Sequence, residues 1–190
     1  DPAPEIGAAE LEAQARAVEA AAMGVKGITQ VEAGAATSRR ALHLAATNGF
    51  SGGYGRSSTS LSAVAFTGQG TAMQRDHAGE ARIYAADMPS AQEIGEKAAR
   101  RALDRVGSVK PKTGTYPVVY DERVAASLVG HLLSAINGSS IARGSSWARD
   151  LLGQQVLPKG ISLIEDPHRP RIGASRPFDG EGLPTQRREI

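Results

Sequence analysis

Residues 120–140, YDERVAASLVGHLLSAINGSS, carry the most regular helical pattern in this 190-residue chain. Asp121 stands at the N-cap position, where its carboxylate can accept hydrogen bonds from the free amides of the first turn. Asn137-Gly138 predicts a left-handed stop at the other end. Between these signals, apolar residues recur at helical spacing and predict one broad buried face: Val124, Ala125, Leu128, Val129, Leu132, Leu133 and Ile136.

The composition excludes several classes of protein. The formal charge is only +2, and aromatic residues make up 4% of the chain, so a basic surface with stacking aromatics for nucleic acid is not expected. The chain has no cysteine, which argues against a disulfide scaffold and fits a reducing cytoplasm. No apolar run is long enough to span a membrane, and no signal peptide is evident. We therefore expect a cytoplasmic protein.

The first half of the chain mixes helix and strand patterns. Residues 8–23 are rich in alanine and glutamate and predict a helix that ends at Gly24. Asn48-Gly49 predicts a hairpin turn between strands, while SGGYGRSS at 51–58 suggests a longer or bulged loop. The strands are expected at residues 25–36, 40–47, 60–66 and 80–85.

A capping box at Ser90 and Glu93 opens a second helix, with a buried stripe ending at Val106. Prolines and glycines at 108–114 then predict a domain boundary, giving an N-terminal domain at 1–112 and the beginning of a C-terminal domain at 113–190. The fold class is α+β. A mainly antiparallel sheet covered by helices is followed by the start of a second β-rich domain with one central helix.

The second half contains shorter elements around the central helix. Strands are expected at 116–120 and within 155–164, and a short helix at 147–152 is expected to carry Trp147 as a core or interface anchor. The loop 166–188 contains Asp166 and His168, but its arginines favour ion pairs with Asp179 and Glu181 over a metal site.

Residues 49–53 match the hydrolase pattern G-x-S-x-G, with Ser51 in the position of the nucleophile. That motif requires a sharp turn from a strand into a helix. A strand-like sequence follows Ser51, so we reject a serine hydrolase.

Three segments in the second half carry a family resemblance: GHLLSAINGSSIARG, DPHRPR and RPFDGEG. With them, the chain from Tyr120 onward resembles the TldD/PmbA family of metallopeptidases, and specifically its PmbA (TldE) side. Members of the family are longer, so we expect this chain to be an internal fragment that exposes unpaired edges and can self-associate.

The resemblance also implies where a zinc site would lie. The zinc-bearing TldD members have a His-Glu-x-x-x-His helix, whose chemical positions fall here on Ala126, Ser127 and His131, and a later cysteine that falls near Ile161. A catalytic zinc needs about three protein ligands and a carboxylate near its bound water. We expect no metal and no catalytic residue in this chain, and we expect His131 to be a partly buried histidine with a hydrogen-bond partner.

Three functions are compatible with the resemblance. The first is a PmbA/TldE-type subunit without its own zinc, paired with a zinc-bearing TldD-type partner around a cavity that admits extended peptides. Its candidate cavity-lining residues are His131, Asn137, Arg143 and Gly144. Arg143 either holds a substrate carboxylate or carbonyl or neutralises a nearby acid. The alternatives are an autonomous metalloprotease and a non-enzymatic modulator of DNA gyrase or of a toxin–antitoxin system.

Overall fold

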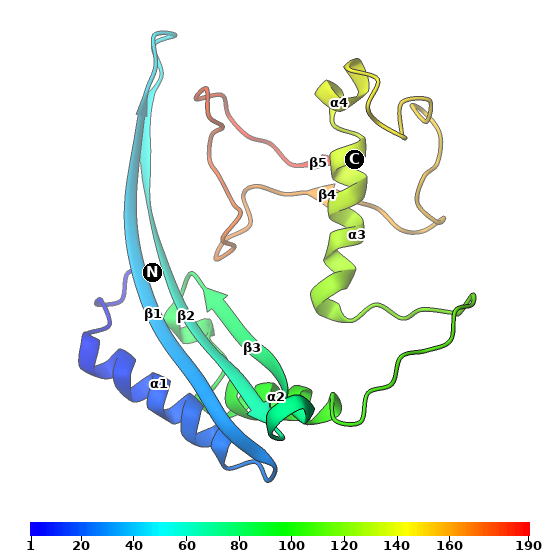
Figure 1. The fold of residues 1–190 in the computed structure, drawn as a ribbon. Helices are drawn as coiled ribbons and strands as arrows, with labels where there is room; N and C mark the ends of the chain where they lie inside the picture. Colours follow the sequence, from blue (N-terminus) through cyan, green and yellow to red (C-terminus); the bar gives the residue numbers. More distant parts are fainter. The chain divides into compact units, whose positions relative to one another are not determined.

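The computed structural model describes residues 1–190 and divides them into two compact units. The first unit comprises residues 1–109 and 165–188, and the second comprises residues 110–164 and 189–190. Figure 1 shows a three-stranded antiparallel sheet with helices in the first unit and a single long helix in the second. The predicted α+β class is confirmed. None of the helices combines the length and apolar character needed to cross a membrane.

The sheet has the order β1-β2-β3, with β1 at Ile28–Ala45, β2 at Ser51–Thr67 and β3 at Gln74–Arg82. β1 and β2 form a long hairpin, whereas β3 pairs only with the second half of β2. The hairpin turns at the predicted place, because Gly49 adopts a φ of 91° that suits glycine.

The glycine-rich stretch at 51–58 is part of β2, so the predicted loop there is wrong. Gly53 lies opposite His43 in the register. A Cβ at Gly53 would come within 2.5 Å of the Leu42 carbonyl oxygen. The glycine therefore lets the two backbones approach closely while the strand remains extended.

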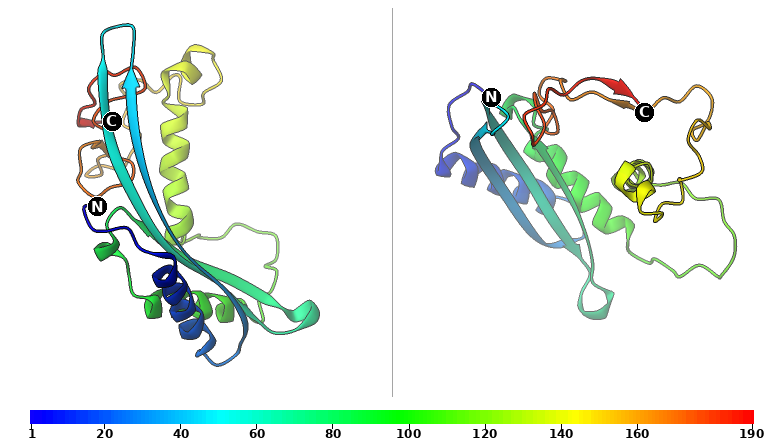
Figure 2. Two further views of the ribbon diagram at one scale, coloured as in Figure 1. Left: turned by 90° about the vertical axis from the view of Figure 1, so that its left-hand side faces the viewer. Right: turned by 90° about the horizontal axis from the view of Figure 1, so that it is seen from above.

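Both predicted helices of the first unit are confirmed: α1 at Ala8–Met23 and α2 at Ala91–Asp104. They pack against each other and on one face of the sheet, as Figure 1 and Figure 2 show. Small side chains dominate the shared core, so the layers approach closely. Its buried members are Val18, Ala22, Leu61, Ala63, Ala65, Ala78, Ile94, Ala98, Ala99 and Ala102.

The start of α2 has the predicted capping box. The Glu93 amide donates to the Ser90 hydroxyl oxygen at 3.2 Å, and the Ser90 amide donates to the Glu93 carboxylate at 2.8 Å. These two bonds satisfy donors that the helix itself leaves free. The backbone hydrogen bond from Ser90, followed by the one from its hydroxyl, lowers the pKa of Glu93.

The lowered pKa of Glu93 predicts a pH dependence of the stability of the first unit. The contribution of Glu93 is present above its unfolded-state pKa and is lost as the pH falls through its folded-state pKa. Glu93→Gln should remove this acid-sensitive part, and Ser90→Ala should cost about 1 kcal/mol at neutral pH. Unfolding at several pH values checks both. Glu19→Gln on α1 is the control for the substitution itself, because the exposed Glu19 side chain makes no hydrogen bond or ion pair.

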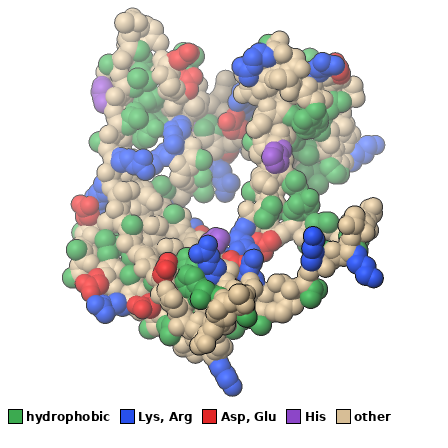
Figure 3. Space-filling model, in the orientation of Figure 1, with side chains coloured by type: hydrophobic (Ala, Val, Ile, Leu, Met, Phe, Trp, Pro, Cys, Tyr) green, Lys and Arg blue, Asp and Glu red, His purple; other side chains and the backbone are tan.

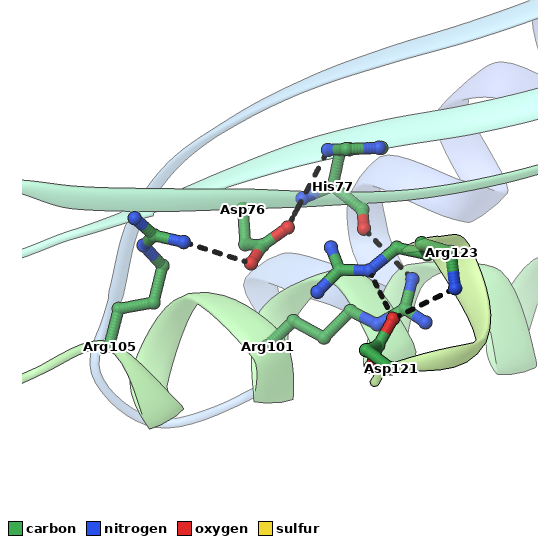
Figure 4. A network of polar contacts seen from close by, with 6 residues as sticks. All are labelled: Asp76, His77, Arg101, Arg105, Asp121 and Arg123. Atoms are coloured by element: carbon green, nitrogen blue, oxygen red, sulfur yellow. Dashed lines mark hydrogen bonds and ion pairs between the residues drawn. The ribbon is translucent and has the colours of Figure 1, made fainter. Parts of the chain in front are cut away.

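The far end of α2 is fixed to β3 by polar contacts, shown in Figure 4. Asp76 is 9% exposed, and its carboxylate lies 3.6 Å from the Arg105 guanidinium and 3.5 Å from the His77 ring. Arg101 donates to the His77 carbonyl oxygen at 3.1 Å. A nearly buried carboxylate needs such partners, so this network orients α2 on the sheet.

Residues 165–188 pack against the β1–β2 hairpin of the first unit. The Phe178 ring lies 4.8 Å from the Phe50 ring and 5.4 Å from the Tyr54 ring, centroid to centroid. The Asn48 side-chain amide donates to the Glu181 carbonyl oxygen at 3.1 Å. The assignment of residues 1–112 and 113–190 to two domains stays a prediction.

The ion pairs predicted for this segment have other partners. Arg171 pairs with Asp87 at 2.6 Å and lies over the Tyr84 ring. Asp179 instead accepts from the backbone amides of Glu181 and Leu183, both at 2.9 Å. Aspartate side chains in tight turns commonly accept hydrogen bonds from backbone amides of the same turn. These amides satisfy the Asp179 carboxylate without an arginine.

The second unit contains the predicted central helix as α3, Glu122–Ala135, with Asp121 as its N-cap. Its predicted end is wrong, because Asn137 does not form a left-handed stop. Asn137 has a φ of −62° and caps a further short helix, α4, at Gly138–Ala142. An asparagine side chain serves equally well as an N-cap, and this role prevails here.

The apolar face of α3 is exposed, contrary to the prediction that it packs inward. Val124, Leu128, Val129 and Leu133 are between 41% and 49% exposed, and only Ala135 of this helix is buried. Figure 3 shows hydrophobic side chains at the surface over this helix. The pattern identified the apolar face correctly, but the second unit contains no layer that covers it.

Several smaller predictions for the second half are wrong. Residues 116–120 form no strand, residues 147–152 form turns rather than a helix, and 155–164 contributes only to the short strand β4 at Ile164–Glu165. β4 pairs with β5, Arg188–Glu189. Trp147 is 64% exposed and therefore not a core residue, and Val106 at the end of the α2 stripe is exposed as well. These short segments depended on packing that their local sequence does not specify.

Candidate functional site

Helix α3 carries the three residues that the resemblance aligns with the family's zinc motif, Ala126, Ser127 and His131, and all three are exposed. The Ser127 hydroxyl donates to the Val124 carbonyl oxygen at 2.6 Å, within the same helix. His131 has neither the burial nor the hydrogen-bond partner that we expected, because no neighbouring segment covers its face of the helix.

These residues do not fit a catalytic zinc. Ala126 and Ile161 offer no donor atom, and the Ser127 hydroxyl is turned back onto its own helix. His131 is therefore the single imidazole at these positions, whereas such a zinc needs about three ligands. Throughout the chain, no three His, Cys, Asp or Glu side chains come together in a metal-binding group. The residues at these positions therefore could not hold a metal that activates a water molecule.

A groove of about 350 Å³ lies beside the end of α3 in the second unit. Its mainly apolar lining comes from Leu132 and Ile136 of α3, from residues 154–158 and 160–163, and from the C-terminal residues 189–190. Ile161, near which the resemblance places the family's cysteine, is part of this lining. The sequence pattern did not reveal the groove, because its 154–163 wall has no regular periodicity.

The remaining candidates lie at or after α4. The Asn137 side chain accepts from the Ser139 amide at 3.0 Å and from its hydroxyl at 2.7 Å. Arg143 ends α4 with an exposed side chain, and Gly144 follows with a φ of 71°. Neither they nor His131 line the groove, so their role in a peptide cavity stays a prediction.

Arg143 forms no ion pair with an aspartate or glutamate. Within this chain Arg143 has no acid to neutralise, and both suggested roles stay predictions. Its guanidinium keeps its donors available for an external carbonyl or carboxylate.

Two family models together match nearly the whole chain. Residues 1–106 match the model of the PmbA/TldA metallopeptidase central domain, and residues 113–190 match that of the PmbA/TldA metallopeptidase C-terminal domain. The chain belongs to the PmbA/TldA (TldD/PmbA) metallopeptidase family.

Two curated relatives show the extent of the similarity. The metalloprotease PmbA of Escherichia coli O157:H7 is 36% identical over 181 residues, which are 95% of this chain and 40% of the relative. The PmbA homolog of Haemophilus influenzae is 43% identical over 97 residues, which are 51% of this chain and 22% of the relative. The chain thus spans less than half the length of these relatives.

Solved structures share the fold. A Bacteroides thetaiotaomicron protein, described as a candidate modulator of DNA gyrase, superposes with a TM-score of 0.89 at 28% identity over 97% of this chain and 43% of its own. TldE from Thermococcus kodakarensis superposes with a TM-score of 0.71 at 17% identity over 100% of this chain and 44% of its own. The second likeness concerns the fold alone.

Proposed function

We propose that this chain is part of a PmbA/TldE-type subunit of a cytoplasmic TldD/PmbA protease, and that the subunit has no zinc site of its own. A TldD-type partner would hold the zinc and carry out hydrolysis, and the two subunits would enclose a cavity for extended peptides. The role of this chain would be to bind and position the peptide.

The observation that supports this proposal most strongly is the set of side chains at the zinc positions. Ala126, Ser127 and Ile161 supply neither an imidazole nor a thiolate, and no carboxylate stands where the general base belongs. The exposed apolar face of α3 also fits a protein that packs against further protein. Self-association of the isolated chain through this face stays an expectation.

Counting zinc in the separate subunits tests the proposal. The intact protein alone should hold no stoichiometric zinc, and its complex with a TldD-type partner should hold about one zinc per pair. His131→Ala should leave that count unchanged, because His131 has no second ligand beside it. About one zinc per isolated chain, lost on His131→Ala, would instead support an autonomous metalloprotease.

Arg143→Ala tests whether α4 borders the peptide cavity. We expect peptide turnover by the complex to fall about threefold to tenfold, because a charge-assisted contact to the peptide is lost. Assembly and zinc content should stay the same. Arg149→Ala is the matched control, since Arg149 is exposed in the same unit and pairs with Asp150 at 3.2 Å. Unchanged turnover would contradict the cavity-lining role, and loss of assembly would indicate a structural one.

A role on DNA gyrase is a second candidate, favoured by the name of the Bacteroides structure. A supercoiling assay with purified gyrase, with and without the intact protein, tests it. Inhibition that persists in a preparation free of the TldD-type partner would support this candidate.

A further inference from the structure

A second concave surface lies in the first unit, apart from the zinc-motif positions. It has a volume of about 430 Å³ and lies between the strand segment 54–56, residues 83–84 and the loop 167–177. This volume is within the range of about 300–1,000 Å³ that is typical of ligand pockets. We call it the arginine groove, after the four arginines that line it: Arg56, Arg169, Arg171 and Arg176.

Most of the positive charge in the arginine groove has no carboxylate partner. Arg171 is the exception, because it pairs with Asp87 at 2.6 Å. Arg56 and Arg176 donate only to carbonyl oxygens, and the Arg169 side chain has no hydrogen bond or ion pair. Three of the four arginines that line the groove therefore have no carboxylate partner.

Two of these guanidinium groups converge on the same acceptors. Arg56 and Arg176 both donate to the carbonyl oxygens of Gly173 and Ser175, those from Arg176 at 3.0 and 2.9 Å. Like charges brought together raise the local positive potential, which a bound anion would offset.

The acids at the groove offset this charge only in part. Asp1 is the only carboxylate in the lining, and its oxygens accept from the backbone amides of Ala3 and Ala85, both at 2.9 Å. Asp166, just before the loop, accepts from the His168 amide at 3.2 Å. The His168 ring contacts the Thr185 hydroxyl at 3.0 Å.

The groove is held in shape before any ligand arrives. The Arg176 amide donates to the Pro167 carbonyl oxygen at 2.9 Å, which closes the loop. The Arg171 guanidinium lies 4.0 Å from the centre of the Tyr84 ring and anchors the loop to the end of β3. Prearranged donors lose little conformational entropy on binding, so they favour a specific ligand.

We propose that the arginine groove binds an acidic side chain, aspartate or glutamate, of an extended peptide. This proposal rests on the proposed function, because it specifies which peptides the subunit would position. Planar guanidinium forks match a carboxylate in two hydrogen bonds, and the apolar walls suit peptide methylene groups. These walls include Tyr54, Tyr84, Ile83, Ile172 and Pro170.

Fluorescence anisotropy on the intact protein, without its partner, tests the arginine groove. The probes are a labelled peptide of glutamate, glycine and serine and its counterpart with glutamine in place of glutamate. We expect the glutamate peptide to bind about tenfold more tightly, as one charge-assisted contact would give. Equal affinities would overturn the proposal. Because no zinc or cleavage is involved, this result is independent of the zinc count above.

Three variants locate the binding. Arg169→Gln should weaken binding of the glutamate peptide about fivefold to tenfold without affecting the fold, since the Arg169 side chain makes no hydrogen bond or ion pair within the chain. Arg176→Lys should give an intermediate loss, because it keeps the charge but not the fork. Arg100→Gln is the control, since Arg100 pairs with Glu96 on the exposed side of α2, and it should bind normally. Wild-type affinity in Arg169→Gln, or equal competition by single-stranded DNA, would overturn the proposal.

Discussion

Gly95→Ala should destabilise the first unit by about 2–3 kcal/mol, although alanine is the better helix former by about 1 kcal/mol. Gly95 lies where α2 crosses α1. An added Cβ would come within 2.5 Å of the Val18 carbonyl oxygen and 2.8 Å of the Ala21 Cβ. Backbone atoms cannot rotate away, so the two helices would have to separate and open the core around Val18 and Ala98.

Urea unfolding followed by circular dichroism measures this effect as a lower midpoint with an unchanged slope. Gly130→Ala is the matched control, because Gly130 also lies within a helix but has no atom within 4 Å of a Cβ placed there. It should stabilise α3 by about 0.5–1 kcal/mol. If both variants change the stability in the same direction, the close contact between α1 and α2 does not determine the effect.

Phe178→Ala should release residues 165–188 from the hairpin. The Phe178 ring contacts Phe50 and Tyr54, and its removal should cost about 2 kcal/mol, less than for a fully buried phenylalanine. Hydrogen exchange should detect the loss as about thirtyfold lower protection of this segment, while the core of the sheet keeps its protection. The arginine groove should lose its ligand as well, because its outer wall is part of the same segment.

Leu183→Ala is the control for Phe178→Ala, because Leu183 belongs to the same segment but is 52% exposed. It should change the protection of residues 165–188 by less than about threefold. Phe178→Leu should retain part of the contact and give an intermediate value. Full protection in Phe178→Ala would show that hydrogen bonds such as that from Asn48 to Glu181 are sufficient to hold the segment.

The local sequence determined the helix starts and turns that depend on only a few neighbouring residues. The capping box at Ser90 and Glu93, the N-cap at Asp121 and the turn at Asn48-Gly49 were predicted correctly, because each depends on one side chain or one φ angle. That Ala126 and Ser127 do not form a His-Glu-x-x-x-His pattern with His131 was also readable from the sequence, since the side-chain atoms are a property of the residue itself.

Tertiary structure alone decided what the elements contact. The periodicity of α3 identified an apolar face but not whether any layer covers it, and Val124 and Leu128 are in fact exposed. The sequence predicted a loop around Gly53, yet Gly53 lies in β2. Its missing side chain lets the partner strand approach closely there. The arginine groove joins Arg56 to Arg176 across 120 positions of sequence. Such long-range contacts depend on how the chain closes its loops, and no local pattern records them.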